Sequence, residues 1–321
     1  SIIMKLLQTF GRQKGHLALL VKNAVIRNLI RDLPRRPFPI ADIKAYGIDA
    51  RKHFGASVDA SLLFLRLGAD VPSAQCTVFE SMASDHPLST FGWCGEKFVA
   101  DVEGYERLHH LDGQSPYVWR QGLKHDCARV MELTGADGRY TNSLGETVEL
   151  EPESVYPLLK SSDLKGAAAG SARFVVPVPQ HKIGEDTAWV AQQFPRLWAY
   201  LERHQSLFRA RKSAIYKGQP RYAMFGIGEY SFAPYKVAVS GLYKRGTFTL
   251  IGPQNGRPVM LDDTCYFLGF DGYEEALRVC TVLNSEPVQR FLQSVVFLDA
   301  KRPYTKELLM RIDLSRAEAT R

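Results

Sequence analysis

The sequence has few cysteines, and no two of them have the spacing of a metal or redox motif. The five cysteines lie far apart, at Cys76, Cys94, Cys127, Cys265 and Cys280. A zinc knuckle or a dithiol redox centre needs a pair separated by two residues, so the pattern excludes both kinds of site. We therefore expect reduced thiols, most of them buried, and no metal site.

Long hydrophobic runs are also missing. No apolar run reaches the length that a transmembrane helix requires. Ser1–Gln13 alternates apolar and basic residues, but it lacks the apolar core and the small-residue cleavage site of a signal peptide. The sequence therefore predicts a cytoplasmic protein.

Strong enzymatic motifs are absent as well. Gly226 and Gly228 lack the third glycine and the strand-to-helix setting of a nucleotide-binding loop, and a β-hairpin explains them better. His109 and His110 are adjacent, so they point apart and cannot hold one metal ion together. Lys124–Cys127 places a cysteine near a histidine, but consecutive residues rarely converge on one reacting group. We expect no catalytic residue in this chain.

What the sequence does have is enough material for two ordinary globular domains. It contains 321 residues, of which 45% are hydrophobic. Its 41 Lys and Arg against 34 Asp and Glu give a net charge of +7. This balance favours a polyanionic partner, although a solvated basic surface would give the same balance.

The first part of the chain has the hydrophobic patterns of an α/β sheet, with a proline-rich break at Pro34–Pro39. A loop holding Phe54 and Gly55 should separate the last two strands. We expect strands at Gly15–Lys22, Ile40–Tyr46 and Ala60–Leu67, and a helix at Asn23–Leu33.

Beyond about Pro72 short strands, turns and scattered aromatic residues replace this regular alternation, so a second domain should begin there. A helix after Pro195 ends in basic residues that suit the helix dipole as well as any ligand. We expect helices within Glu185–Lys212, at Glu274–Leu283 and at Val288–Phe297, hairpins within Tyr222–Leu250, and a linker at Ala167–Ala172.

One segment of this second part, Val118–Leu133, interleaves aromatic and basic residues. Cations of this kind can meet phosphates or guanine edges, and flat rings can stack on bases or pack against sugars. The mixture is typical of a nucleic-acid surface, and a solvated basic face is the alternative. The candidate DNA contacts are Trp119, Arg120, Lys124, His125 and Arg129.

The run from Gly15 to Leu67 resembles a segment of the N6-adenine DNA methyltransferases of the gamma class. GHLALLVKNAVIRNLI is similar to the strand and helix that follow the family's Asn-Pro-Pro-aromatic motif. DARKHFGASVDASLLFLRL is similar to a family hairpin in which a phenylalanine precedes a loop and a strand. The resemblance implies that Phe54 stacks on the flipped-out adenine, whereas a core position at the strand start is the alternative.

The rest of the chain resembles the specificity domains of TaqI-like and Eco57I-like restriction-modification enzymes. The order of four segments carries this resemblance: WRQGLKHDCARVME, VYPLLKSSDLKG, a helix ending in LFRARK, and VLNSEPVQRFL followed by KRPYTKELL. In those domains the segment corresponding to Leu283–Ser285 belongs to a helix end rather than to a catalytic site. Residue type and family position add four phosphate-binding candidates: Lys160, Lys236, Lys301 and Arg302.

Two motifs of the family are missing from the sequence. Neither the methyl-donor loop nor the Asn-Pro-Pro-aromatic motif, which binds the target amine, is present. The resemblance implies that both lie upstream of Ser1, in a missing N-terminal methyltransferase half. S-adenosylmethionine would then serve the full-length enzyme, and we expect neither binding of this cofactor nor methylation by this chain alone.

The expected architecture is α/β followed by α+β. Residues 1–75 should form the closing part of a Rossmann-like methyltransferase sheet, and residues 76–321 a mixed target-recognition domain. The implied function is DNA target recognition and target-base holding for adenine-N6 methylation in a restriction-modification system. Double-stranded DNA is the expected partner, with a restriction endonuclease as a potential second one.

Three alternatives stay open. A stand-alone DNA-binding or specificity module would need no catalytic motif. A nuclease would need magnesium ligands such as an Asp with a downstream Glu-x-Lys cluster, which the sequence does not offer convincingly. A protein-interaction scaffold would show none of the steep salt dependence of a DNA binder.

Overall fold

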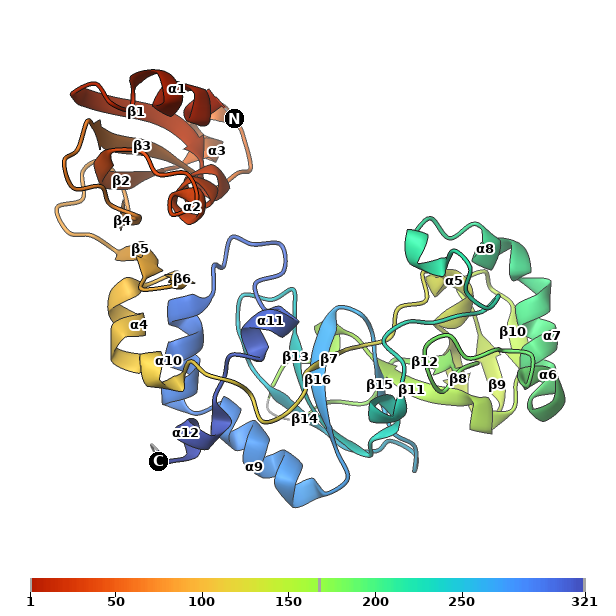
Figure 1. Ribbon diagram of the computed structural model, residues 1–321. Helices are drawn as coiled ribbons and strands as arrows, with labels where there is room; N and C mark the ends of the chain where they lie inside the picture. Colours follow the sequence, from red (N-terminus) through yellow and green to blue (C-terminus); the bar gives the residue numbers. More distant parts are fainter. Residues whose placement is uncertain (1, 167–168, 320–321) are drawn as a thin grey trace. The chain divides into compact units, whose positions relative to one another are not determined.

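The computed structural model describes residues 2–166 and 169–319. The chain divides into two compact units, and each unit is discontinuous in sequence (Figure 1). The first unit contains Ser1–Asp112 with Glu286–Pro303, and the second contains Gly113–Ser285 with Tyr304–Arg321. Within the described ranges, none of the helices combines the length and the apolar character that crossing a membrane would require.

The first unit is built on a six-stranded sheet with the order β1-β3-β2-β4-β5-β6. Strands β2 and β4 run parallel, and the other neighbouring pairs run antiparallel. The strands are β1 (Gly15–Lys22), β2 (Ile40–Ile48), β3 (Ala60–Leu67), β4 (Gln75–Phe79), β5 (Ser89–Cys94) and β6 (Lys97–Val99). The helices are α1 (Ile2–Phe10), α2 (Asn23–Asp32), α3 (Ala50–Phe54), α4 (Val102–Leu108) and α10 (Glu286–Val295), with a 3-10 turn at His109–Leu111.

Side-chain alternation explains why one face of this sheet is buried. In β3, Leu63 and Leu65 are fully buried, whereas the intervening Leu62 and Phe64 are half-exposed. The buried leucines share a hydrophobic cluster with Ile30 of α2 and with residues of α1. The strands and the helix expected in this part of the sequence are confirmed, and β2 is two residues longer than predicted.

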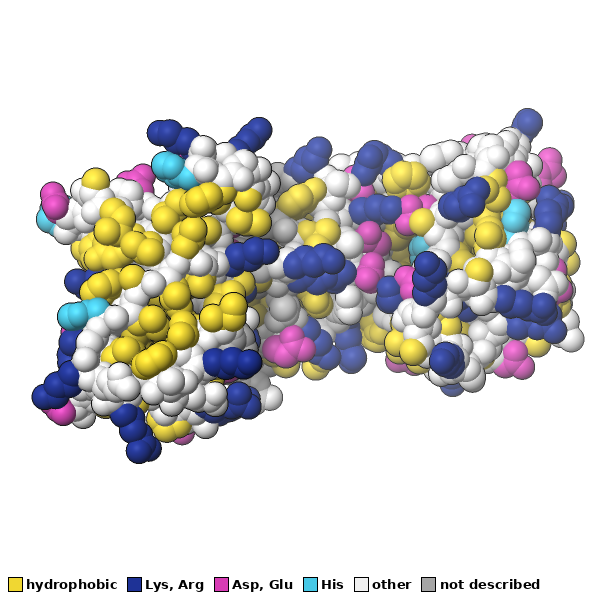
Figure 2. Space-filling model, turned by 90° about the horizontal axis from the view of Figure 1, so that it is seen from above, with side chains coloured by type: hydrophobic (Ala, Val, Ile, Leu, Met, Phe, Trp, Pro, Cys, Tyr) yellow, Lys and Arg dark blue, Asp and Glu magenta, His cyan; other side chains and the backbone are white. Residues whose placement is uncertain are grey.

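The opposite face of the sheet carries apolar side chains that are only partly covered. Leu20 of β1 is 47% exposed and is paired with Leu62 of β3. Tyr46 and Phe79 stack across β2 and β4 with ring centroids 5.0 Å apart. Within the described ranges β1 pairs only with β3, so its other edge is open. Figure 2 shows hydrophobic side chains gathered on this unit.

The sheet does not end near residue 75, where the change of sequence texture favours a domain boundary. Strand β4 pairs in parallel with β2, and β5 and β6 extend the same sheet by antiparallel pairing. Strands β4, β5 and β6 are shorter than β1, β2 and β3, but they continue the same hydrogen-bonded sheet. The hydrophobic pattern of the sequence therefore changes although the chain stays within the first unit. The division of roles between residues 1–75 and 76–321 stays a prediction.

The second unit contains three smaller sheets, with the orders β10-β9-β8, β12-β11-β15 and β14-β13-β16-β7. Its strands are β7 (Arg120–Gln121), β8 (Thr134–Ala136), β9 (Arg139–Thr141), β10 (Thr147–Glu149), β11 (Val155–Leu159), β12 (Phe174–Pro177), β13 (Tyr235–Ser240), β14 (Thr249–Ile251), β15 (Met260–Leu261) and β16 (Cys265–Phe270). Its helices are α5 (Ala128–Met131), α6 (Val190–Gln193), α7 (Pro195–Arg203), α8 (Gln205–Arg209), α9 (Tyr273–Leu283), α11 (Lys306–Leu309) and α12 (Leu314–Ala319). Short 3-10 turns lie at Pro152–Ser154, Ser161–Asp163, Ala214–Tyr216 and Glu229–Phe232.

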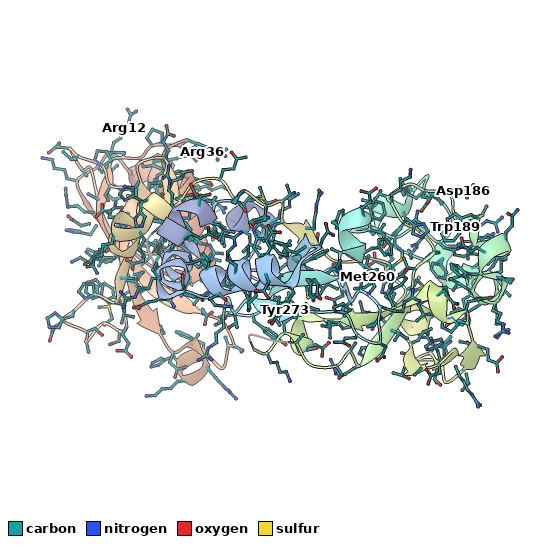
Figure 3. All side chains as sticks on the ribbon, turned by 90° about the horizontal axis from the view of Figure 1, so that it is seen from below. Arg12, Arg36, Asp186, Trp189, Met260 and Tyr273 are labelled. Atoms are coloured by element: carbon teal, nitrogen blue, oxygen red, sulfur yellow. The ribbon has the colours of Figure 1, made fainter. Side chains whose placement is uncertain are left out.

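Two hydrophobic clusters hold this unit together. The larger one joins α7 and α8 to strands β9–β12 and includes Met260 of β15, with Trp189 packed against it. Both side chains are labelled in Figure 3. The smaller cluster lies around β13 and β16 and includes Phe267. Mixed helices and strands in several sheets therefore make up the whole chain.

Three sequence expectations need correction or qualification here. The long helix predicted before Lys212 is divided, because α7 ends at Arg203 and α8 begins at Gln205. Within Tyr222–Leu250 the hairpin prediction is confirmed in part, because β13 pairs antiparallel with the next strand, β14, whereas the described residues before Tyr235 form turns and a 3-10 helix instead of a hairpin. Residues 167–168 of the predicted linker lie outside the described residues. The helices predicted near residues 274–283 and 288–297 are confirmed as α9 and α10.

Candidate functional site

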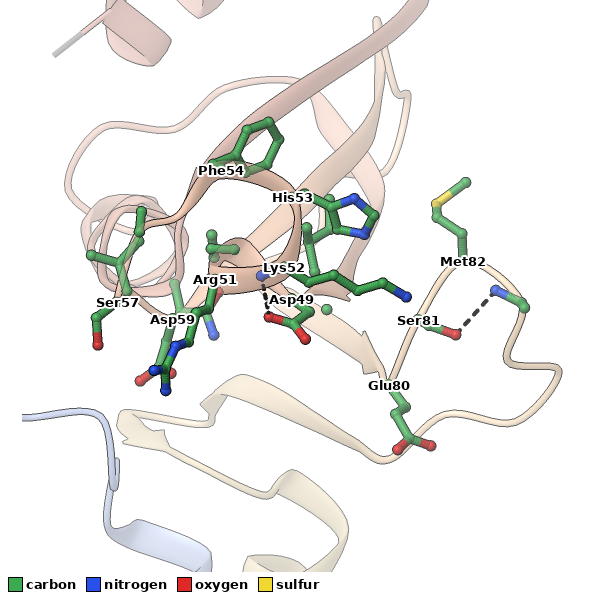
Figure 4. Close-up of a pocket in the computed structure, with 18 residues that line it drawn as sticks. Asp49, Arg51, Lys52, His53, Phe54, Ser57, Asp59, Glu80, Ser81 and Met82 are labelled. Atoms are coloured by element: carbon green, nitrogen blue, oxygen red, sulfur yellow. Dashed lines mark hydrogen bonds between the residues drawn. The ribbon is translucent and has the colours of Figure 1, made fainter.

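A hollow of about 1190 Å³ lies at one end of the sheet of the first unit (Figure 4). Two stretches line most of it, residues 47–60 and residues 80–83. The first stretch includes α3 and the loop leading into β3, and the second is the loop after β4. The hollow therefore lies at the ends of adjacent strands β2 and β4, where loops can present side chains from a rigid support.

The short helix α3 is fixed at both of its ends. Asp49 caps its start, because the carboxylate accepts a hydrogen bond of 2.9 Å from the backbone N–H of Lys52. Gly55 ends the helix with a φ of 64°, a left-handed conformation that glycine adopts without strain. Phe54 is therefore the last residue of a short helix, whereas the sequence predicts that it lies in a loop.

Phe54 is not a core residue. Its side chain is 60% exposed and belongs to the lining of the hollow. The ring of His53 lies beside it, with the centroids 6.2 Å apart and the planes tilted. In Figure 4 the Phe54 ring stands away from the helix, and Lys52 extends towards the loop that holds Met82. An exposed aromatic ring of this kind can accept a flat ligand by stacking.

The charges around the hollow have both signs. Arg51, Lys52 and His53 contribute basic groups, and Asp49, Asp59 and Glu80 contribute acidic groups. In the described part of the chain no group of three or more His, Cys, Asp or Glu side chains could hold a metal ion. Hydrogen bonding and stacking are thus the interactions that this site offers.

Trp119 and Lys236 are two of three predicted DNA contacts that are buried in the second unit, and both predictions are wrong. Trp119 is fully buried and lies against Phe248, with ring centroids 5.7 Å apart. Lys236 is 1% exposed, and its Nζ donates a hydrogen bond of 2.6 Å to the Ala233 carbonyl. Burial lowers the pKa of Lys236 to about 7. Neither side chain can reach a duplex in this fold.

His125 is also unsuited to the role of a cationic DNA contact. The side chain is buried, and Nδ1 accepts a hydrogen bond of 3.1 Å from the backbone N–H of Cys127. Burial is the main cause that lowers its pKa to about 4, with the Lys160 charge as a second cause. His125 is therefore a neutral, structural residue near neutral pH.

The lysines of the same region are held by acidic partners. Lys124 lies 2.6 Å from an Asp126 carboxylate oxygen, and Lys160 is paired with Glu132. Lys124 and His125 share a small cavity with several acidic residues: Asp126, Glu132, Asp262 and Asp263. The charge of this cavity is consequently not basic overall, despite the basic appearance of the segment in sequence.

The other predicted contacts are placed differently. Arg120 is half-exposed, with its guanidinium carbon 4.6 Å from the centroid of the Tyr230 ring. Arg129 is exposed in the second unit. Lys301 is exposed and Arg302 half-exposed in the first unit. These four side chains stay candidates.

A basic cluster that sequence reasoning did not select lies between Gln205 and Tyr222. This stretch has five Lys or Arg residues and no Asp or Glu. It lines a separate cavity in the second unit. The run of basic residues is visible in the sequence. It follows a helix end, however, where basic side chains are also favoured by the helix dipole, so the sequence alone does not identify it as a binding site.

The prediction that most of the cysteines are buried is confirmed. All five cysteines are free, four of them are buried, and Cys94 is half-exposed. Burial raises the pKa of Cys76 to about 12 and that of Cys127 to about 11. Thiols with such pKa values are poor nucleophiles near neutral pH.

Comparison with known proteins relates the chain to restriction-modification enzymes. No protein-family model matches the sequence. Over 314 residues, 98% of this chain, the sequence is 35% identical to the type II methyltransferase M.NspV of a Nostoc strain. The chain spans 65% of that protein's length. Identity of this extent makes the two proteins homologous.

Two solved structures are similar in fold. The type IIL restriction-modification enzyme MmeI, in complex with DNA, matches with a TM-score of 0.57 and 12% identity, covering 96% of this chain and 40% of that one. The type IIG restriction endonuclease BpuSI matches with a TM-score of 0.39 and 12% identity, covering 92% of this chain and 39% of that one. At 12% identity the likeness to MmeI concerns the fold alone.

Proposed function

From the homology to a type II methyltransferase, we propose that this chain serves DNA methylation in a restriction-modification system. Its part is to recognise the DNA target and to hold the target base, which we infer to be an adenine methylated at N6. The observation that carries the proposal is 35% identity to M.NspV along 98% of the chain. The gamma class and the TaqI-like or Eco57I-like type of specificity domain are finer parts of the same proposal.

We propose that this chain does not itself hold the methyl donor. Strand β1 continues directly from Lys22 into α2 at Asn23, so no glycine-rich loop separates strand from helix there. The chain spans 65% of M.NspV, and we propose that the counterpart of the remaining part supplies the S-adenosylmethionine site and the Asn-Pro-Pro-aromatic motif. The chain would then be the C-terminal part of such an enzyme.

The sheet of the first unit supports this division. The free edge of β1 offers backbone N–H and C=O groups that a further strand can pair with. Leu20, Leu62 and Phe64 lie on one face of β1 and β3 and are at least half-exposed. Further elements of the same N-terminal part would cover this apolar face. A Rossmann-like sheet completed by an N-terminal half has both properties.

Phe54 is our candidate for holding the target base. An enzyme that acts on a base inside a duplex must extrude that base, and stacking on an aromatic ring offsets part of the lost base stacking. The exposed ring lies beside a hollow large enough to admit a nucleotide. The second unit would choose the site, with Arg120 and Arg129 as candidate contacts to base edges or phosphates.

Four further cations are candidate phosphate contacts. Lys301 and Arg302 belong to the first unit, and Lys124 and Lys160 belong to the second. The two lysines of the second unit would have to exchange their carboxylate partners for phosphate, which reduces the net gain from each contact. A restriction endonuclease would be a second partner of the complete system.

The first experiment is a pair of titrations on the purified chain. Calorimetry with S-adenosylmethionine is expected to show no saturable binding. Fluorescence anisotropy with duplex DNA is expected to show binding whose affinity falls steeply with salt, because each phosphate contact releases counterions. Saturable cofactor binding would contradict the proposed division of the enzyme. Absence of DNA binding at every salt concentration would contradict the recognition role and favour a protein-interaction scaffold.

A further inference from the structure

The basic cavity in the second unit has an unusual composition. The chain from Gln205 to Tyr222 carries five of the cationic side chains and no carboxylate. All five line one cavity of about 420 Å³, which has no acidic residue in its wall. They are Arg209, Arg211, Lys212, Lys217 and Arg221. Figure 2 shows Lys and Arg side chains on the surface of this unit.

Arg211 lines the cavity and fixes the shape of the segment. Its guanidinium donates to the backbone carbonyls of Phe208, Ala223 and Arg221, at 3.0, 2.6 and 3.0 Å. Three carbonyls held by one side chain close the chain from α8 to residue 223 into a preformed loop. Arg211 forms no ion pair with any described residue, and the nearby Asp126 is paired with Lys124.

Most of the remaining cations in the wall have no partner in the protein. Arg209, Lys212 and Lys217 are exposed and make no side-chain hydrogen bond or ion pair with any described residue. Arg221 differs, because its Nη1 lies 2.8 Å from a Glu202 oxygen. Like charges held close together repel one another, so the gathering of Arg209, Lys212 and Lys217 does not stabilise the fold.

Tyr216 supplies a neutral donor in the same cavity. Its ring lies 3.7 Å from the Arg211 guanidinium carbon, measured to the ring centroid. The phenol oxygen is buried; the Arg211 guanidinium can donate to it, but its own O–H has no acceptor among the described residues. Burial raises the pKa of this phenol above its usual value, so the hydroxyl keeps its proton as a donor. A buried donor without a partner is costly unless a ligand satisfies it.

We propose that this cavity binds a backbone phosphate of DNA, with Lys212, Lys217 and the Tyr216 hydroxyl as its ligands. The proposal rests on the proposed function, which makes duplex DNA the partner of this unit. A phosphate diester supplies the negative charge that the cations lack and the acceptor oxygen that the phenol lacks. The contact positions the duplex without reading its sequence.

The test is a salt series of binding by the 321-residue chain to a 30-base-pair duplex of mixed sequence, followed by fluorescence anisotropy. In the Lys212→Gln/Lys217→Gln double variant, the plot of log affinity against log salt should become less steep by about 2, equally for all sequences. Tyr216→Phe should weaken binding without changing the slope, because it removes no charge.

The matched control is the Lys182→Gln/Lys244→Gln double variant, which removes the same charge from exposed positions of the same unit. It should keep the slope of the unchanged protein, and thermal unfolding should verify that all variants fold. Equal slopes for the two double variants would overturn the cavity proposal while leaving the proposed function intact. No DNA binding by the unchanged chain would overturn both.

Discussion

The exposed ring of Phe54 is the residue whose replacement tests base holding most directly. A preferred duplex is first selected from a random library with the unchanged chain. Phe54→Ala should then lower the affinity for that duplex by about 1–3 kcal/mol, the usual value of stacking one base on an aromatic ring. Phe54→Trp should retain most of the affinity. Anisotropy measures the affinity, and 2-aminopurine fluorescence at the target position reports the extruded base.

Met82→Ala is the matched control for this prediction. Met82 lines the same hollow and is 63% exposed, against 60% for Phe54. Removing it therefore changes a similar apolar surface without removing a ring. If Phe54→Ala and Met82→Ala have the same effect on binding and on 2-aminopurine fluorescence, Phe54 does not hold the base.

Lys236 provides a prediction about stability and pH. Its pKa is about 7 in the folded protein against 10.5 for an ordinary lysine, so from pH 7 to 10.5 the unfolded chain binds a proton that the folded chain does not. This residue therefore makes the free energy of unfolding rise with pH through that window. Lys236→Met should raise this free energy at pH 7 by up to roughly 5 kcal/mol, less the cost of the Ala233 carbonyl that loses its donor.

Urea denaturation at pH 7 and pH 10 measures both effects of Lys236→Met. The gain at pH 7 should be larger than the gain at pH 10, because at pH 10 the lysine of the folded chain is neutral and that of the unfolded chain has begun to lose its proton. Lys244→Met, at an exposed position, should change little at either pH. A lower free energy of unfolding for Lys236→Met at pH 7 would show that the ammonium group is stabilised by something other than the Ala233 carbonyl.

Residue type and spacing could predict only part of the candidate site. The sequence identifies Phe54 through resemblance, but only the fold shows that its ring is exposed. Trp119 and Lys236 have the residue types of DNA contacts, yet burial removes both from the surface. Lys124 and Lys160 have the residue type of DNA contacts, but the fold pairs them with the Asp126 and Glu132 carboxylates. Burial and pairing are properties of tertiary structure, which short sequence patterns do not contain.

At the scale of elements, the end of α9 shows why one polar residue belongs to the fold. Asn284 caps this helix, and its side chain pairs with both backbone groups of Phe248, accepting from the N–H at 3.0 Å and donating to the carbonyl at 2.8 Å. This agrees with a helix-end role for Leu283–Ser285. Asn284→Ala would leave the N–H of the fully buried Phe248 without this acceptor, and its carbonyl with only the weak Cys280 thiol as a donor.

We expect Asn284→Ala to lower the free energy of unfolding by about 2–3 kcal/mol, the cost of unsatisfied buried backbone groups. Asn284→Asp should also destabilise, because a carboxylate cannot donate to the Phe248 carbonyl. Chemical denaturation measures both changes. Asn28→Ala, on an exposed position of α2, is the control and should have little effect. Equal stabilities of the Asn284 and Asn28 variants would remove the bridging role of Asn284.

Elements with regular hydrophobic patterns could be predicted, and irregular ones could not. Strands β1 and β3 and helices α2 and α9 have the bounds that the sequence indicates within one or two residues. The turn-rich stretch before Tyr235 alternates polar and apolar residues without forming strands, because its backbone bonds go to turns and to neighbouring loops such as Lys124 with Phe225. Alternation predicts a strand only where a partner strand is available.

At the scale of the whole molecule, the discontinuity of both units is the feature that local patterns could not reveal. Residues 286–303 belong to the first unit although 173 residues of the second, Gly113–Ser285, precede them in the chain. Helix α10 follows α9 after a turn in sequence, yet the two helices belong to different units. Long-range packing decides such assignments, and hydrophobic periodicity is the same for either unit.

The contribution of residues 286–303 to the first unit can be tested by removing them. The Ser294 carbonyl accepts hydrogen bonds from the backbone N–H groups of Ala100 and Asp101, at 2.7 and 2.9 Å. Phe297 stacks on Phe98 and meets Phe91 edge-on, with centroid separations of 5.0 and 5.8 Å.

A protein of residues 1–112 alone would expose these rings to water and should lose cooperative thermal unfolding. Joining residues 286–303 to it through a flexible Gly/Ser linker should restore that cooperativity, because the segment then returns its apolar surface and acceptor groups to the same sites. Circular dichroism and amide hydrogen exchange of the two proteins make the measurement, with a linked segment carrying Phe297→Ala as the matched control. Cooperative unfolding of residues 1–112 at the temperature of the linked protein would mean that the first unit is complete without α10.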